Sequence, residues 1–185
     1  MRIYIQTHGC SNNFYESEIM MGILSKNNFE IADAPEDADI IIINICTVKG
    51  NETALRTIKN LKKNYHDKRL IIAGCISKDI IQEIRKIDED APLVNTHNIT
   101  NIVEVIEELM QGNILESLAR TKEIKVNLPK IRLNKIIGIV PIASGCADYC
   151  AYCSVKLVKG YIHSYPQKKI IEEIKENLKE GCKEI

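Results

Sequence analysis

Three cysteines near the end of the chain have a spacing that suits a metal cofactor. Cys146, Cys150 and Cys153, here called the C-terminal thiols, lie in GCADYCAYC, with Tyr152 just before the last of them. Thiolates in this arrangement suit a multi-iron centre better than one structural zinc ion, which normally takes four protein ligands. Three ligands on a four-iron cluster leave one iron open, so we expect this iron to bind a further molecule.

Three more cysteines lie in the first half of the chain. Cys10, Cys46 and Cys75, here called the N-terminal thiols, each follow or end a short β-prone segment: RIYIQT, DIIIINIC and RLIIAG. Ligands of open parallel sheets bind outside the carboxyl ends of the strands. We therefore expect the N-terminal thiols to converge on one crevice. For each thiol alone the competing interpretation is packing, since free cysteine is among the most buried residue types.

These segments belong to a regular alternation of strands and helices. Strands are predicted at 2–7, 29–32, 39–46, 69–74 and 92–95, and helices at 14–26, 51–65, 79–87 and 100–110. Asn13 is the expected N-cap of the first helix. The almost continuous branched apolar residues of DIIIINIC are typical of a strand covered on both faces. Residues 1–113 are therefore predicted to form a flavodoxin-like, doubly wound parallel sheet in the order 2-1-3-4-5.

The second half begins with a basic connector at 114–135. We interpret the connector as a solvated linker, with contact to a phosphate backbone as the alternative. A second module is predicted at 136–185: a strand at 136–142, the cysteine loop, an irregular segment at 155–165, and a helix at 166–181. The apolar stripe of this helix is predicted to be buried, and it consists of Ile170, Ile171, Ile174 and Leu178. This module is one unit of a β/α barrel, which needs about 250 residues, so we expect it to be truncated.

Composition limits the classes of protein that the chain can belong to. Lys plus Arg and Asp plus Glu are both 25, so no global positive field indicates nucleic-acid binding. The seven cysteines follow no secretory leader, and the longest apolar runs are too short to cross a bilayer. We expect a soluble, cytoplasmic protein with reduced thiols and no membrane partner.

The remaining cysteine and three histidines are not expected to bind metal. Cys182 is expected to pack in a core, and His66, His97 and His163 have no partner at the spacing of metal ligands.

Four motifs resemble the methylthiotransferases, a radical S-adenosylmethionine family with an N-terminal flavodoxin-like domain. They are THGCSNNFYESEIM, NICTVKGNETALRTI, AGC and GCADYCAYC, and they span nearly the whole chain. The tail, with SYP at 164–166 and GCKEI at 181–185, is most similar to the archaeal and eukaryotic branch that modifies threonylcarbamoyladenosine in tRNA. Two positions depart from the family pattern: Lys159 precedes Gly160 where Arg is expected, and His8 stands where an aromatic or apolar residue is commoner.

The resemblance implies a radical enzyme with two 4Fe-4S clusters. The C-terminal thiols would hold the radical cluster, with S-adenosylmethionine at its open iron, and the N-terminal thiols an auxiliary cluster for sulfur insertion. The implied reaction converts threonylcarbamoyladenosine beside the anticodon to its 2-methylthio derivative. Most of the barrel and the RNA-binding domain of the family would lie beyond Ile185. We therefore expect this chain alone to be inactive, and tRNA to be bound mainly by the missing parts. The electron donor, sulfur source and oligomeric state are not indicated.

Several alternatives stay open from the sequence. Within the resemblance, the substrate is a ribosomal protein or isopentenyladenosine in the other branches. Outside it, the cysteines suit a non-catalytic zinc or iron–sulfur module that scaffolds RNA or protein. A flavoprotein with residues 7–13 as phosphate loop is allowed by the predicted fold alone. The absence of Trp and the unexplained cysteines disfavour that last interpretation.

Overall fold

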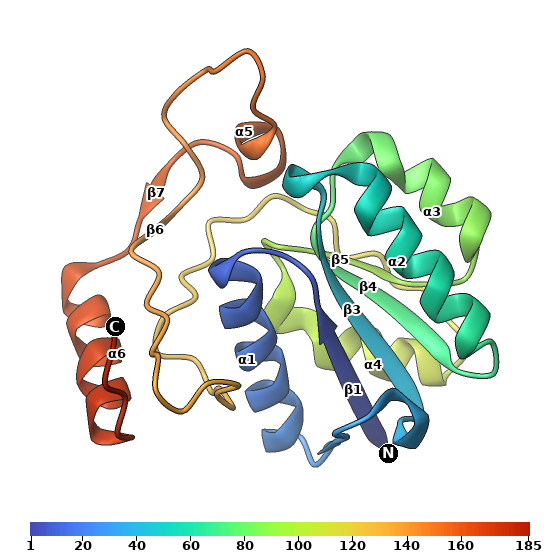
Figure 1. The fold of residues 1–185 in the computed structure, drawn as a ribbon, viewed down its shortest axis with the longest axis horizontal. Helices are drawn as coiled ribbons and strands as arrows, with labels where there is room; N and C mark the ends of the chain where they lie inside the picture. Colours follow the sequence, from blue (N-terminus) through green and yellow to red (C-terminus); the bar gives the residue numbers. More distant parts are fainter.

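The computed structural model describes residues 1–185 and contains a five-stranded parallel sheet with helices on both faces (Figure 1). The strand order is β2-β1-β3-β4-β5 and every neighbouring pair is parallel. The strands are β1 (Arg2–Thr7), β2 (Glu30–Ile31), β3 (Ile40–Cys46), β4 (Arg69–Cys75) and β5 (Leu93–Asn95). This confirms the predicted doubly wound sheet and its order, and it is consistent with a flavodoxin-like domain.

Four helices cover the two faces of this sheet. They are α1 (Ser11–Lys26), α2 (Asn51–Asn64), α3 (Ile81–Ile87) and α4 (Ile102–Met110). Helices α1 and α4 pack with Ile40 and Ile42 on one face, and α2 and α3 pack with Ile41 and Ile43 on the other. Alternate residues of a strand point to opposite faces, so the isoleucine run of β3 fills both cores. None of the helices combines the length and hydrophobicity that a membrane span needs.

Helix α1 begins earlier than predicted. Its N-cap is Cys10, and Asn13 lies in the first turn as a fully buried residue, so the prediction of Asn13 as N-cap was wrong. The side-chain oxygen of Asn13 accepts a hydrogen bond from the backbone N–H of Cys10 at 3.3 Å. This reverse contact of a capping box satisfies one backbone donor at the start of the helix. It also fixes the first N-terminal thiol to the sheet side of α1.

The connector is not a solvated linker along its whole length. Lys125 and Val126 are only 3% and 2% exposed, and the backbone N–H of Ile131 donates to Glu18 O of α1 at 2.9 Å. A Cβ at Gly22 of α1 would lie 2.3 Å from the backbone nitrogen of Lys130. The connector therefore packs tightly on the side of α1 that faces away from the sheet. This explains why α1 is buried almost all round.

The second module has less regular structure than predicted. Residues 136–142 form no strand; they make only an isolated parallel bridge between Ile137 and Glu184. Instead β6 (Ala143–Ser144) pairs antiparallel with β7 (His163–Ser164) at the base of the cysteine loop. A short helix, α5 (Val155–Lys159), occupies part of the segment predicted to be irregular. The cysteine loop and α5 lie together above the sheet edge in Figure 1.

Helix α6 (Gln167–Lys179) buries only part of the predicted stripe: Ile170 and Ile174 are partly buried, and the most buried positions of the helix are polar. Glu173 and Asn177 are 2% and 0% exposed, whereas Ile171 and Leu178 are 42% and 54% exposed. The polar face is buried because Lys130 of the connector donates to the carboxylate of Glu173 and, at 2.6 Å, to Asn177 Oδ1. A buried ammonium needs such partners, so the ion pair decides which face of α6 meets the connector.

Candidate functional site

Two of the N-terminal thiols lie side by side at the carboxyl edge of the sheet. Cys46 and Cys75 are register partners at the ends of β3 and β4. The hydrogen bond from the Cys75 thiol favours the thiolate of Cys46 and lowers the pKa of Cys46 to about 6. The same hydrogen bond, followed by burial, raises the pKa of Cys75 well above its ordinary value. The contact between the two thiols therefore moves their pKa values in opposite directions.

The third N-terminal thiol lies on the neighbouring loop, after β1. Cys10 is exposed, and it follows Gly9, whose carbonyl accepts a hydrogen bond from Lys49 Nζ at 2.8 Å. Gly9 and Cys46 line the same cavity of about 150 Å³. The loops after β1 and β3 therefore face each other, and the structure brings all three loops to one edge. It records direct contact only between Cys46 and Cys75.

A buried amide network fixes the loop after β1 to β3. Asn13 Nδ2 donates to Asn44 Oδ1 and to Ile45 O, each at 3.0 Å. Asn44 Nδ2 donates in return to Asn13 O at 2.8 Å and to Ser17 Oγ at 2.9 Å. Both asparagines are fully buried. Because unpaired amides are costly in a core, this network positions the backbone on both sides of Cys46.

Gly74 is required next to the same network. Its φ is +103°, and a Cβ there would lie 2.2 Å from Asn44 Oδ1 and 2.5 Å from Ile45 O. No side chain fits so close to the neighbouring strand. The glycine lets β4 approach β3 closely just before Cys75. The glycine of the motif Ala73-Gly74-Cys75 is therefore required by the close approach of the two strands.

The C-terminal thiols surround a separate cavity of about 390 Å³. Cys150 is exposed and Cys146 and Cys153 are partly buried. The loop is held by hydrogen bonds from Cys146 N–H to Gly160 O at 3.2 Å and from Cys153 N–H to Cys150 O at 3.1 Å. Tyr149 and Tyr152 are 84% and 93% exposed, so neither aromatic ring is used in packing. The three thiols share one space that opens to solvent.

Both sets supply three cysteine sulfurs, the soft donors that iron–sulfur clusters and zinc take. No group of three or more His, Cys, Asp or Glu side chains is arranged to hold one metal ion. In a multi-iron cluster each thiolate binds a different iron, so the sulfur atoms stand further apart than around one ion. The cavity at the C-terminal thiols falls within the usual size range of ligand pockets, about 300–1,000 Å³. Cys182 belongs to neither set; it is buried and contacts Arg132, as predicted for packing.

A larger cavity of about 970 Å³ lies between the two sets of thiols. One wall consists of the residues after β3 and β4, including Lys49 and Lys78. The other wall consists of Arg120 from the connector and Ser154 and Leu157 from the start of α5. Most of its lining residues are polar, and they include both basic and acidic side chains, among them Arg120, Glu52 and Asp79. It offers room for a polar ligand between the two candidate sites.

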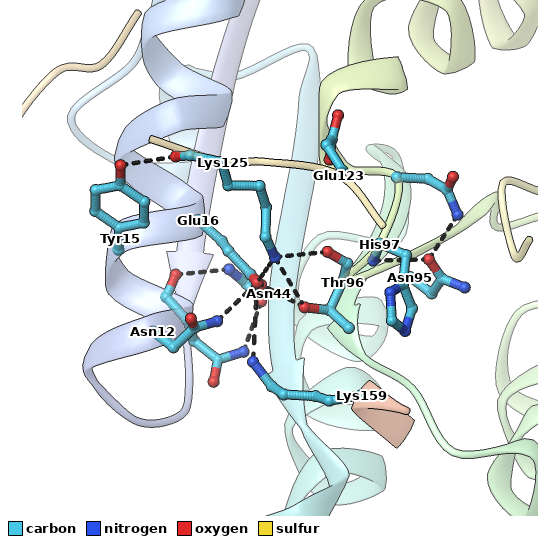
Figure 2. Close-up of polar contacts among 12 residues, drawn as sticks. Asn12, Tyr15, Glu16, Asn44, Asn95, Thr96, His97, Glu123, Lys125 and Lys159 are labelled. Atoms are coloured by element: carbon cyan, nitrogen blue, oxygen red, sulfur yellow. Dashed lines mark hydrogen bonds and ion pairs between the residues drawn. The ribbon is translucent and has the colours of Figure 1, made fainter. Parts of the chain in front are cut away.

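A buried ion network joins α1, the connector and α5, and no sequence motif indicated it. Figure 2 shows Glu16 of α1 meeting Lys125 of the connector, Thr96 after β5 and Lys159 of α5. Burial by itself would raise the pKa of Glu16, but the charges of Lys125 and Lys159 outweigh burial and hold that pKa below its ordinary value. The sequence held no usable signal for this network, because the burial of α1 on almost every side depends on its contacts with the connector.

The fold and these sites together define the class of protein. The chain is a doubly wound α/β protein with two candidate centres for thiolate-ligated cofactors, one at its sheet edge and one on a following loop. A four-iron cluster that is held by only three cysteines has one iron that can bind a further ligand.

Comparisons with known proteins identify the family. Residues 2–96 match the model described as "Uncharacterized protein family UPF0004", and the chain belongs to this family. Over its whole length the chain is 34% identical to the probable threonylcarbamoyladenosine tRNA methylthiotransferase of Methanothermobacter thermautotrophicus and 30% identical to the zebrafish (Danio rerio) threonylcarbamoyladenosine tRNA methylthiotransferase. It is also 34% identical to the tRNA-2-methylthio-N(6)-dimethylallyladenosine synthase of Bacillus licheniformis. The resemblance to methylthiotransferases is confirmed.

The matched relatives are much longer than this chain. All 185 residues align, but they cover 44%, 35% and 38% of the archaeal, zebrafish and bacterial relatives respectively. The chain thus spans less than half the length of these curated relatives. The relatives are named as enzymes that act on tRNA.

Proposed function

We propose that this chain is part of a tRNA methylthiotransferase that converts threonylcarbamoyladenosine next to the anticodon to its 2-methylthio derivative. The observation that carries the proposal is the pair of three-thiol sets, one at the sheet edge and one around its own cavity. The names of the archaeal and zebrafish relatives support the substrate. The charged and polar residues that line the 970 Å³ cavity support a polar substrate.

The roles proposed for the cysteines follow from their environments. Cys10, Cys46 and Cys75 would hold an auxiliary 4Fe-4S cluster, and the C-terminal thiols would hold a second one with S-adenosylmethionine at its open iron. When bound, these groups supply radical formation and the sulfur-transfer site. The chain itself supplies thiolates: the hydrogen bond from Cys75 keeps Cys46 ready to ligate. Exposure of Cys150 leaves the second site accessible to cofactor.

The proposed domain division is 1–113 for the flavodoxin-like domain, 114–135 for the connector and 136–185 for the start of a radical S-adenosylmethionine barrel. The parallel bridge between Ile137 and Glu184 supports the last part, because α6 joins the two bridged segments as in a β/α unit. The hydrogen bond from Gly138 N–H to Glu184 O, at 2.8 Å, extends that pairing. The remaining strands of such a barrel would lie outside this chain.

Iron loading tests the proposed ligands directly. The chain is reconstituted anaerobically with iron and sulfide, and iron content and Mössbauer spectra are recorded. We expect two clusters per chain in the parent protein. Changing the N-terminal thiols together to alanine should remove one cluster and leave the spectrum of the other unchanged. Cys182→Ala is the matched control and should retain both. Unchanged iron content in the triple variant would contradict the proposed auxiliary site.

Mass spectrometry of tRNA tests the proposed substrate. In cells that lack the full-length protein, 2-methylthio-threonylcarbamoyladenosine should disappear and its unmodified precursor should accumulate. The similarity to the bacterial synthase keeps one second candidate substrate, N(6)-dimethylallyladenosine. Loss of the methylthio group from that nucleoside alone would replace the proposed substrate with the bacterial one. A normal profile of both nucleosides would overturn the function.

A further inference from the structure

Three consecutive residues of α5 contact the N-terminal part of the chain. The carbonyl oxygen of Leu157 accepts a hydrogen bond from Arg120, and the carbonyl oxygen of Val158 lies 3.1 Å from His97 Nε2. The ammonium of Lys159 lies 3.9 Å from Glu16 Oε1. Helix α5 begins two residues after Cys153, the last of the C-terminal thiols. A shift of α5 would therefore move the cysteine loop directly, because only one residue separates Cys153 from the helix.

The partners of α5 come from three separate segments, and two of them are deeply buried. Glu16 belongs to α1 and is 0% exposed, and His97 follows β5 and is 9% exposed. His97 is itself held by its other ring nitrogen, which lies 3.0 Å from Thr121 O of the connector. Glu16 is held by Lys125 and by the hydroxyl of Thr96, which donates at 2.6 Å. Rigid, buried partners of this kind define one position for the helix that they contact.

The cysteine loop has few other supports. Apart from the β6–β7 pairing at its base and the internal hydrogen bond from Cys153 to Cys150, it is held by the hydrogen bond from Cys146 N–H to Gly160 O and by Lys156. The ammonium of Lys156 donates to Ala147 O at 3.1 Å and lies over the ring of Tyr149. These last contacts run between the loop and α5 or the residue after it. The loop is therefore held to α5, and α5 is held to the sheet domain. Leu157 also forms part of the wall of the 970 Å³ cavity, so the position of α5 sets the width of the space between the two thiol sets.

We propose that Glu16, His97 and Arg120 form a latch that grips Leu157–Lys159 and thereby positions the C-terminal thiols relative to the N-terminal thiols. These are positioning residues, since they act through α5. The consequence for catalysis rests on the proposed function, because the distance between two thiol sets matters only if both hold reacting groups. The latch itself does not depend on that function. A displacement of reacting groups by about 1 Å can lower a rate about 100-fold.

Amide hydrogen exchange measures the latch without any cofactor. The double variant Arg120→Met, Lys159→Met removes two of the three contacts to α5. Arg120 is exposed and Lys159 is partly exposed, so the buried ion pair between Glu16 and Lys125 stays intact. The amides of Cys146, Val158 and Gly160 should exchange at least about fivefold faster than in the parent chain. The amides of β3 should not change. The matched control is Lys122→Met, Lys168→Met, which removes the same charge from two exposed positions and should leave all these rates unchanged.

Restoring a cation tests whether the charge at 159 matters. Arg120→Met, Lys159→Arg should recover part of the slow exchange, because a guanidinium can also reach Glu16. Equal exchange in the double variant and the parent, or an equal increase in the control, would overturn the latch. In the full-length protein, Lys159→Met alone, which leaves Arg120 in the wall of the 970 Å³ cavity, should keep its iron content and the KM for tRNA while kcat falls about 10- to 100-fold. Faster exchange with unchanged kcat would leave the latch intact and refute its role in the proposed reaction.

Discussion

Removing the ammonium of Lys125 should destabilise the protein through Glu16. In Lys125→Met the carboxylate, 0% exposed, loses its main partner. Removal of one member of a buried ion pair typically costs about 3–5 kcal/mol. The hydroxyl of Thr96 at 2.6 Å, the amide of Asn12 at 2.7 Å and the more distant Lys159 remain. We therefore expect a loss near the lower limit, about 3 kcal/mol in the free energy of unfolding.

Urea unfolding followed by circular dichroism measures this loss. Lys122→Met is the matched control, since Lys122 is an exposed lysine of the same connector, and it should change stability by less than about 0.5 kcal/mol. The double variant Glu16→Gln, Lys125→Met has no charge at either position of this buried pair. It should therefore be much less destabilised than the sum of the two single variants. Additive losses would show that the two side chains do not stabilise each other, and would refute the reasoning.

The dependence on pH has a defined sign. In the parent protein the pKa of Glu16 lies below its ordinary value, because Lys125 and Lys159 outweigh burial. Its ionised form therefore contributes stability above the ordinary pKa, and this contribution is lost as pH falls through the folded-state pKa. In Lys125→Met burial is no longer outweighed, and the pKa of Glu16 should rise above its ordinary value. The variant can then protonate Glu16 as pH falls. The stability difference from the parent should therefore be smaller at about pH 5 than at about pH 7.

Two further predictions concern the sheet edge. Gly74→Ala should destabilise the fold by more than about 3 kcal/mol because its Cβ would overlap Asn44, whereas Gly112→Ala, with φ of +87° and open space around it, should cost only about 1 kcal/mol in the same urea titration. In the metal-free chain, iodoacetamide should modify Cys46 half-maximally near pH 6. Cys75→Ala removes the hydrogen bond and should move that midpoint upward; an unchanged midpoint would contradict the hydrogen bond.

The sheet was predictable because its signal is local. The run of isoleucines in β3 has no polar position that could face water, so a strand buried on both faces was the direct interpretation. The alternation with helices then indicated a doubly wound sheet, and the order 2-1-3-4-5 is the flavodoxin-like form of that architecture. Boundaries such as the start of α1 shifted because Cys10, which is a poor cap by residue type, is braced by Asn13. The position of Asn13 depends on its hydrogen bonds to Asn44 and Ile45 of β3. These contacts are distant in sequence, so no local sequence pattern could predict them.

The second module was less predictable because its contacts are with distant segments. The apolar stripe of α6 was expected to be buried, but the buried face carries Glu173, which pairs with Lys130. Hydrophobic periodicity identifies the face of a helix that can be buried in apolar surroundings. It does not detect an ion pair whose two residues lie 43 positions apart in the sequence. Ile171 and Leu178 are consequently left exposed. The same limitation hid Glu16 and Lys125.

The ion pairs that the sequence did not reveal explain how the two thiol sets come to lie near each other. Motifs place each set on its own loop, but nothing in a motif specifies the distance between loops. That distance depends on the connector, which is pinned to α1 by Lys125 and to α6 by Lys130, and on α5, which is pinned by Lys159. All three lysines find buried carboxylates. A buried charge pair often adds little net stability over apolar residues of similar size, but its hydrogen bonds require one relative position of the two segments that carry it. Replacing them with apolar residues of similar size should therefore preserve folding better than it preserves the placement of the cysteine loop.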